Sequence, residues 1–254
     1  MIDIFAKPLG ALLKIVYGFV SGIGMDFASL SAFSIAVIIT TIIFKFLLLP
    51  LTLKQMKSMK GMQEIQPKLQ ELQKKYKNDP QTLNTKTMEL YKEHKVNPFG
   101  GCFPLLIQFP IIIAFFRVMQ TPVPYVFKDQ ATYDAINKSF LWIKDIALAP
   151  NALVDGVMNG LQVGTFNVPI LAIIAAVTTY FSSKMMSTAQ QGAQNDQAQA
   201  TQKTMTIMMP IFILWIGAKY AAGLTLYWVV SNVFQIVQQY FTNRSLGKVK
   251  EESN

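Results

Sequence analysis

The sequence predicts an all-α integral membrane protein with five transmembrane helices. Of its 254 residues, 52% are hydrophobic and 15% are charged, a more apolar balance than soluble domains have. A helix needs about 20 mostly apolar residues to cross a bilayer, and five windows meet that need without any Asp or Glu. They lie at about 33–53, 101–120, 166–184, 204–220 and 223–242.

The distribution of charge predicts the orientation of these spans. The segment 54–97 contains ten Lys against five acids, whereas 121–165 contains three Lys against four Asp. Cytoplasmic loops carry an excess of Lys and Arg, so we expect 54–97, 185–203 and the tail 243–254 in the cytoplasm and the N-terminus outside. The net charge of +9 follows from these flanking clusters and does not indicate sequence-specific nucleic-acid binding.

Residues 1–28 predict an amphipathic helix that lies in the membrane interface, ahead of the five-span core 29–254. Lys7, Lys14 and Ser21 are seven residues apart and share one helix face, whereas most of their neighbours are apolar. That combination is typical of interfacial helices. A cleaved signal peptide is the alternative, because a basic start and an apolar stretch are both present.

The segment 54–97 predicts a cytoplasmic hairpin of two helices. Apolar side chains step by three and four residues in the first helix, which gives a heptad-like seam, and Pro67 is expected to restart that helix in its first turn. Asn78-Asp79-Pro80 predicts a break, followed by a second helix over about 81–94. The seam consists of Met62, Ile65, Leu69, Leu72 and Tyr76 in the first helix and Leu83, Thr87 and Leu90 in the second.

The outer face of this predicted hairpin is rich in lysine. Such a face attracts anionic lipid headgroups or ribosomal RNA without sequence specificity. A solvated linker is the alternative interpretation of 54–97.

Lys45 lies near the middle of the first predicted span. A lysine at the centre of a transmembrane helix costs about 2.5–3.5 kcal/mol on insertion scales, so its presence requires a reason. Snorkelling is one, but Lys45 lies nine residues before Lys54, or about 13 Å along a helix. Ser34, Thr41 and Thr52 share its helix face and form a polar stripe with it.

The fifth predicted span carries a second polar stripe, and the second span adds Gln108. This stripe consists of Thr225, Trp228, Asn232, Gln235 and Gln239, with Ser231 at its edge. Polar stripes can hold membrane helices together through hydrogen bonds, or two of them can line one hydrated cavity. Since no predicted span offers an acid to pair with Lys45, this lysine either is neutral or meets a negative charge that a ligand brings. The two stripes together with Lys45 favour the hydrated cavity, and its seven predicted site residues are Lys45, Thr41, Ser34, Gln108, Trp228, Asn232 and Gln235.

The sequence contains no pattern that predicts catalysis, a metal site or a cofactor. It has one Cys and one His, and it lacks phosphate-loop and nucleophile-elbow motifs. A secondary transporter or channel for a small solute is an alternative function. Coupled transporters usually contain intramembrane acids and often inverted repeats, and neither is apparent here.

Several motifs resemble those of the YidC/Oxa-type membrane insertases, in the Gram-positive form without a large external domain. The resemblance covers about 30–245 and rests on Gln66-Pro67-Lys68-Leu69-Gln70-Glu71-Leu72, Asn97-Pro98-Phe99-Gly100-Gly101-Cys102-Phe103-Pro104, Gln108-Phe109-Pro110 and Leu224-Thr225-Leu226-Tyr227-Trp228-Val229-Val230-Ser231-Asn232.

The resemblance implies a non-enzymatic insertase and chaperone of the bacterial cytoplasmic membrane. Its clients would be nascent membrane proteins, and its partners the ribosome and the Sec translocon. Lys45 aligns with a groove cation that is usually Arg in this family. Lysine differs because it can lose its charge and lacks the planar fork of arginine.

Overall fold

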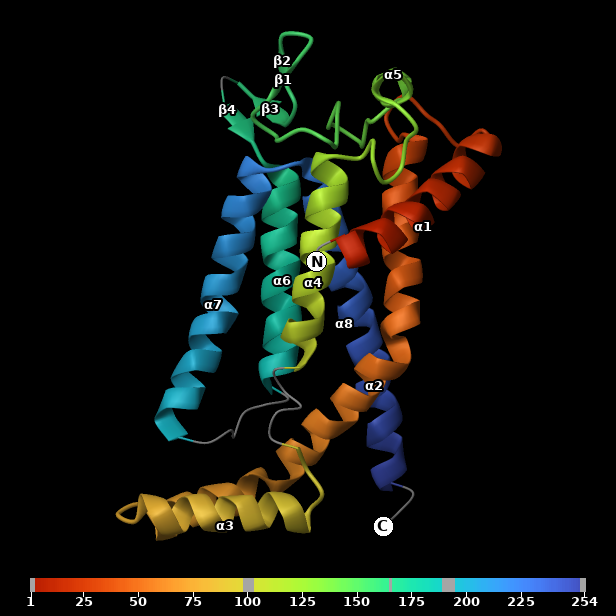
Figure 1. Ribbon diagram of the computed structural model, residues 1–254. Helices are drawn as coiled ribbons and strands as arrows, with labels where there is room; N and C mark the ends of the chain where they lie inside the picture. Colours follow the sequence, from red (N-terminus) through yellow and green to blue (C-terminus); the bar gives the residue numbers. More distant parts are fainter. Residues whose placement is uncertain (1–2, 98–102, 165, 189–194, 252–254) are drawn as a thin grey trace. The chain divides into compact units, whose positions relative to one another are not determined.

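The computed structural model describes residues 3–97, 103–164, 166–188 and 195–251, and most of them are helical (Figure 1). The helices are α1 (Asp3–Gly22), α2 (Ala32–Lys75), α3 (Pro80–Glu93), α4 (Phe103–Gln120), α5 (Gln130–Ala135), α6 (Ile170–Thr188), α7 (Asn195–Lys219) and α8 (Ala222–Glu251). Four short strands form two antiparallel hairpins, β1 (Leu153–Val154) with β2 (Val157–Met158) and β3 (Leu161–Val163) with β4 (Phe166–Val168).

The chain divides into two compact units. The first unit comprises Met1–Leu47, Ile107–Thr179 and Met209–Phe234, and the second comprises Leu48–Leu106, Tyr180–Met208 and Gln235–Asn254. The first unit contains most of the predicted site residues, and the second contains the predicted hairpin.

By length and composition, two helical segments among the described residues are long and apolar enough to cross a membrane. They are Asp3–Gly22 and Ala32–Met62, and shorter apolar helices cover Gln108–Gln120, Ile170–Met186 and Thr206–Lys219. The fifth predicted window falls in α8, where amide side chains interrupt the apolar sequence. The number of spans and their orientation therefore stay a prediction.

The predicted start of the third window is wrong by four residues. Residues 166–168 form β4, which pairs with β3 in the register Leu161↔Val168, Gln162↔Asn167 and Val163↔Phe166. Pro169 follows β4, and α6 begins at Ile170. Proline has no N–H to give to a helix or a ladder, so it suits the boundary between the strand and the helix. Hydropathy alone had merged the apolar strand with the helix.

Helix α1 presents three different faces along its length. One face is buried against the rest of the first unit and consists of Ala6, Leu9, Gly10, Leu13, Val16 and Val20. A second, exposed face is apolar and includes Ile4, Ile15 and Phe19, each more than 60% exposed. Lys7 and Lys14 are exposed on a third face, between the other two. A helix with one face against protein, one charged face suited to water and one exposed apolar face suits a membrane interface.

The segment between α4 and α6 supports the beginning of α8 through main-chain hydrogen bonds. The backbone amides of Ala222 and Gly223 donate to the carbonyl oxygens of Leu148 and Ile146 at 2.9 and 2.6 Å. The fully buried Asn159 fixes this loop, because its side-chain amide donates to the Leu148 carbonyl at 3.2 Å and to other carbonyls of the loop. The first unit thereby satisfies orphan N–H groups at the N-terminus of α8.

In the second unit, the C-terminal part of α2 and α3 form a helix pair with its own apolar core. Ile65 and Leu69 of α2 are buried together with Leu90 and Tyr91 of α3, as the predicted seam requires. The expected restart at Pro67 is wrong, because α2 runs through Pro67 without a break. The buried neighbours Ile65 and Leu69 offset the hydrogen bond that a proline removes.

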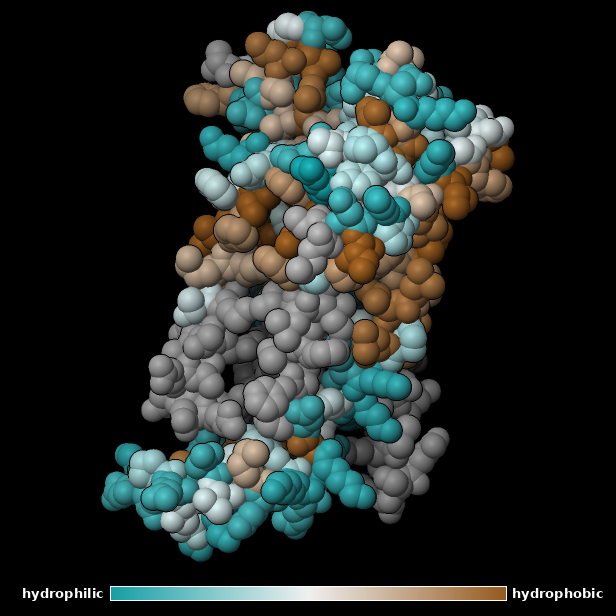
Figure 2. Space-filling model, viewed as in Figure 1, coloured by the Kyte–Doolittle hydropathy of each residue, from teal (hydrophilic) through white to brown (hydrophobic). Residues whose placement is uncertain are grey.

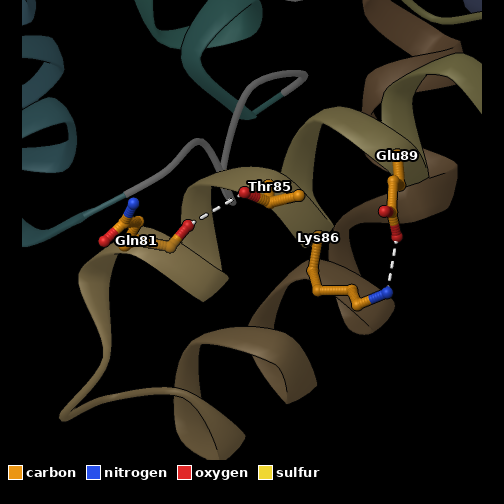
Figure 3. A network of polar contacts seen from close by, with 4 residues as sticks. All are labelled: Gln81, Thr85, Lys86 and Glu89. Carbon is orange, nitrogen blue, oxygen red and sulfur yellow. Dashed lines mark hydrogen bonds and ion pairs between the residues drawn. The ribbon is translucent and has the colours of Figure 1, made fainter.

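The break between the two helices lies where the sequence predicts it. Asp79 caps α3 by accepting hydrogen bonds from the Thr82 amide at 3.1 Å and the Thr82 hydroxyl at 2.6 Å, and Pro80 follows in the first turn. Figure 3 shows polar contacts along α3, among them the ion pair of Lys86 with Glu89 at 2.7 Å. Figure 2 shows mostly hydrophilic side chains over this helix pair.

Candidate functional site

The polar stripe of α2 begins with two buried hydroxyl groups in the first unit. Ser34 is fully buried and its hydroxyl donates to the Ser31 carbonyl at 2.8 Å. Thr41 is also fully buried and donates to the Val37 carbonyl at 2.7 Å. Both hydroxyls therefore satisfy part of their hydrogen-bonding capacity within α2 itself, which costs the helix little.

Lys45 is half-buried one turn after Thr41. It makes no hydrogen bond or ion pair with any residue of the described part of the chain. The next residue, Phe46, packs edge-to-face on Phe234 of α8, with 5.1 Å between the ring centroids. The backbone of α2 thus lies close to α8 beside Lys45, and the hydrogen-bonding capacity of the ammonium group is unused within the described part of the chain.

Gln108 joins α4 to α8. Its side-chain amide donates to the hydroxyl of Tyr227, and the Tyr227 ring stacks on Phe115 of α4 at a centroid distance of 4.1 Å. Trp228, the next residue, is buried. Tyr227 was not among the predicted site residues, although an amide inside a span needs a partner, and that need is the signal that could have found it.

Asn232 joins α8 to α6. Its side-chain nitrogen lies 2.8 Å from the Thr179 hydroxyl, 3.3 Å from the Thr178 hydroxyl and 3.5 Å from the Ala175 carbonyl oxygen. This geometry supports the interpretation that part of the second stripe holds helices together.

Three glutamines follow Asn232 along α8, in the second unit. Gln235 donates to the sulfur of Met186 at 2.9 Å, and Gln239 donates to the Met185 carbonyl at 2.9 Å, so both bind α6. Gln238 projects from another side of α8 and donates to the Thr52 hydroxyl of α2 at 2.7 Å. Gln238 was not among the predicted site residues, because the helical wheel places it away from the stripe.

Six of the seven predicted site residues lie in the first unit: Ser34, Thr41, Lys45, Gln108, Trp228 and Asn232. The hydroxyls of Thr40 and Thr225 in the same unit are buried and have no hydrogen-bond partner among the described residues. Among all the residues that the structure describes, no three His, Cys, Asp or Glu side chains come together as metal ligands. The arrangement offers hydrogen-bond donors and a cation.

The fold and the site together define a class of mostly helical proteins with polar side chains among apolar helices. Residues 25–250 match the family described as the 60Kd inner membrane protein. The chain belongs to this family.

Three relatives that bear the name membrane protein insertase YidC are similar over most of their length. The protein of Caldanaerobacter subterraneus subsp. tengcongensis is 38% identical over 249 residues, which is 98% of either chain. The protein of Fusobacterium nucleatum is 40% identical, over 82% of this chain and 85% of the relative. The protein of Clostridium perfringens is 36% identical, over 97% of this chain and 96% of the relative.

Proposed function

We propose that this protein is a membrane protein insertase of the bacterial cytoplasmic membrane. It inserts newly made membrane proteins and helps them to fold, and it forms no covalent bond with them. The observation that carries the proposal is the likeness to relatives that bear the insertase name, which extends over 98% of this chain at 38% identity. The polar side chains in the first unit give that activity a physical basis.

The proposed mechanism is a substrate groove centred on Lys45. A short polar segment of the client enters beside Lys45 and Gln108, which are half-buried, and its polar groups exchange water for these partners, while the buried Thr41 and Trp228 lie behind them. The client's polar segment then has a shorter path across bare hydrocarbon. This lowers the free-energy barrier to its translocation, because unpaired polar groups are costly in hydrocarbon. The client's apolar segment then moves into lipid, where burial supplies about 25 cal/mol per Å².

The two stripes have different tasks in this mechanism. Lys45 has no partner within the described part of the chain, so its charge is free to meet a client. Asn232 and Gln235 donate to α6, and we assign them the task of keeping α8 against α6. Ser34 is hydrogen-bonded to Ser31 and supports the start of α2.

The proposed topology has five spans, with the N-terminus outside and the C-terminus in the cytoplasm. The exposed apolar face of α1 contains Ile15 and Phe19, which supports a position in the interface for that helix. The helix pair at the end of α2 and α3 then lies in the cytoplasm. Its lysines suit anionic lipid headgroups and the ribosome, and the Sec translocon is a further proposed partner.

Site-specific crosslinking to nascent membrane proteins tests the proposal. A photo-reactive amino acid replaces Lys45 or Gln108, both of which are half-buried, and ribosomes carrying a stalled client are added. We expect adducts to the client from both positions. The matched control is Val177 of α6, which is 48% exposed on an apolar surface and should crosslink to lipid. If depletion of the protein impairs uptake of one solute, and no client adduct forms, the protein is a transporter instead.

A further inference from the structure

The β3–β4 hairpin has one apolar face, which is partly buried at Leu161 and Val168 and exposed near the turn. Residues at successive positions of a strand point to opposite faces, so the pairs Leu161–Val168 and Val163–Phe166 share one face. On this face Val163 is 58% exposed and Phe166 is 76% exposed. Figure 2 shows further hydrophobic side chains over the β1–β2 hairpin at the top of the view.

The opposite face of the same hairpin is polar and attached to the protein. It carries the pair Gln162–Asn167. The side-chain amide of Asn167 donates to the Pro150 carbonyl at 2.6 Å, and Gly160 leaves room for it, since a Cβ there would lie 2.1 Å from the Asn167 side-chain oxygen. The anchored polar face fixes which way the apolar face points.

The helix that follows the hairpin, α6, also exposes apolar side chains. Ile173, Ile174 and Val177 of α6 are 37–48% exposed, and lipid covers such residues if α6 spans the membrane. Phe166 precedes Ile170, the first residue of α6, by four residues, so the two lie at most about 14 Å apart. Between Ile146 and Phe181 the only charged residue is Asp155, and it belongs to the other hairpin.

We propose that the β3–β4 hairpin is a membrane anchor, whose apolar face lies in the interfacial layer of the outer leaflet. Leu161, Val163, Phe166 and Val168 contact lipid there, while Gln162 faces water. The ladder is short and its edges need hydrogen-bond partners, which the interface offers and the hydrocarbon core does not. The proposal rests on the proposed span of α6.

Fluorescent labels on single cysteines test this anchor. Cys102 is the only cysteine, so a Cys102→Ser protein accepts one new cysteine at Val163 or Phe166, and Gln162 gives a control on the other face of the same strand. Each variant carries an environment-sensitive dye in lipid nanodiscs, which expose both membrane surfaces to solvent. We expect blue-shifted emission, quenching by nitroxide on lipid headgroups and loss of iodide quenching at 163 and 166. Position 162 should remain open to iodide.

The other outcomes overturn the proposal in distinguishable ways. Iodide quenching at 163 and 166 equal to that at 162 means that the hairpin stays in water. Protection from iodide without quenching by nitroxide lipid means that a protein, such as a second copy, covers the face. A label at Val177 must be quenched by acyl-chain nitroxide, and its failure would contradict the span of α6 instead. A Phe166→Asp change should abolish the blue shift at 163 without lowering the melting temperature in detergent.

Discussion

Asn232 on α8 donates its side-chain amide to the hydroxyl of Thr179 on α6 at 2.8 Å. Thr179 is buried, and its hydroxyl donates a hydrogen bond to the Ala175 carbonyl at 2.7 Å. The amide, the hydroxyl and the carbonyl thus form a chain of hydrogen bonds between two helices. In a membrane such a chain holds helices together, because lipid provides no hydrophobic force between them.

Replacement of Asn232 should therefore weaken the protein itself. Asn232→Leu keeps the side-chain size but removes the donor, and we expect a loss of about 0.6 kcal/mol and at most about 1.7 kcal/mol. Thermal unfolding in detergent measures it. Thr178→Val is the control and should cost less, since the Thr178 hydroxyl lies farther from the amide, at 3.3 Å. Unchanged stability with loss of client adducts would place Asn232 in the groove instead.

Replacement by alanine should affect the stability of the protein differently at two glycines of α1. A Cβ at Gly10 would lie 2.5 Å from the Cβ of Tyr125, whereas a Cβ at Gly18 would meet nothing within 4 Å. Gly10→Ala should lower the melting temperature by pushing α1 away from Tyr125. Gly18→Ala should leave it unchanged or raise stability by about 0.5–1 kcal/mol, because alanine favours the helix. Equal effects of both changes would contradict the close packing of α1 at Gly10.

The proposed orientation predicts which positions an impermeant reagent reaches in intact cells. Thr85 is exposed on α3, where its hydroxyl donates to the Gln81 carbonyl at 3.1 Å (Figure 3). In a Cys102→Ser protein, cysteine at Thr85 or in the tail 243–254 should react only after lysis. Cysteine at the exposed Ala135 should react in intact cells. Reaction at Thr85 in intact cells would overturn the five-span topology.

The start of α3 should lose protection from hydrogen exchange in acid. Hydrogen bonds from Thr82 hold the pKa of Asp79 below its ordinary value of 3.8. A depressed pKa stabilises the folded state above the ordinary pKa, and this contribution disappears as the pH falls through the folded pKa. Protection factors of the first turn, corrected for intrinsic exchange, should fall in that range. Asp79→Asn should keep the cap without the pH dependence, and Asp79→Ala should lose protection at every pH.

Local patterns in the sequence predicted those parts of the fold that local physics decides. The break at Asp79-Pro80 and the burial of Ile65, Leu69 and Leu90 follow from capping and from helical periodicity. The run from Phe166 could not be divided by hydropathy, because an apolar strand and an apolar helix look alike over a few residues.

The partners of the site residues could not be predicted in the same way. A helical wheel shows that Lys45 and Thr41 share a face, but it does not show which helix they meet. The bond from Gln108 to Tyr227 joins residues far apart in the chain, and nothing in either segment alone specifies it. The helical wheel shows which residues share a face with Asn232, but whether that face binds α6 or lines a cavity depends on packing.

The effect of the Lys45 charge on insertion should grow with the number of acidic residues in the client's translocated segment. If the ammonium attracts acidic residues in the translocated segment, Lys45→Arg retains insertion, because charge and position survive. Lys45→Glu should impair insertion most, since it replaces attraction by repulsion in a medium that screens charge poorly. Lys45→Gln should impair clients with one or two acidic residues and spare a client with none.

The competing explanation is that Lys45 only keeps the groove hydrated. Glutamine would then replace it equally well for every client, because a neutral amide also binds water. Insertion of three matched clients, with zero, one and two acidic residues, separates the two explanations when wild type, Lys45→Arg and Lys45→Gln are compared at equal abundance. Attraction predicts a Gln defect that grows with each acid and an Arg variant that stays near wild type. Equal sensitivity of all three clients to Lys45→Gln would exclude attraction, because a hydrated groove does not distinguish acidic from neutral segments by charge.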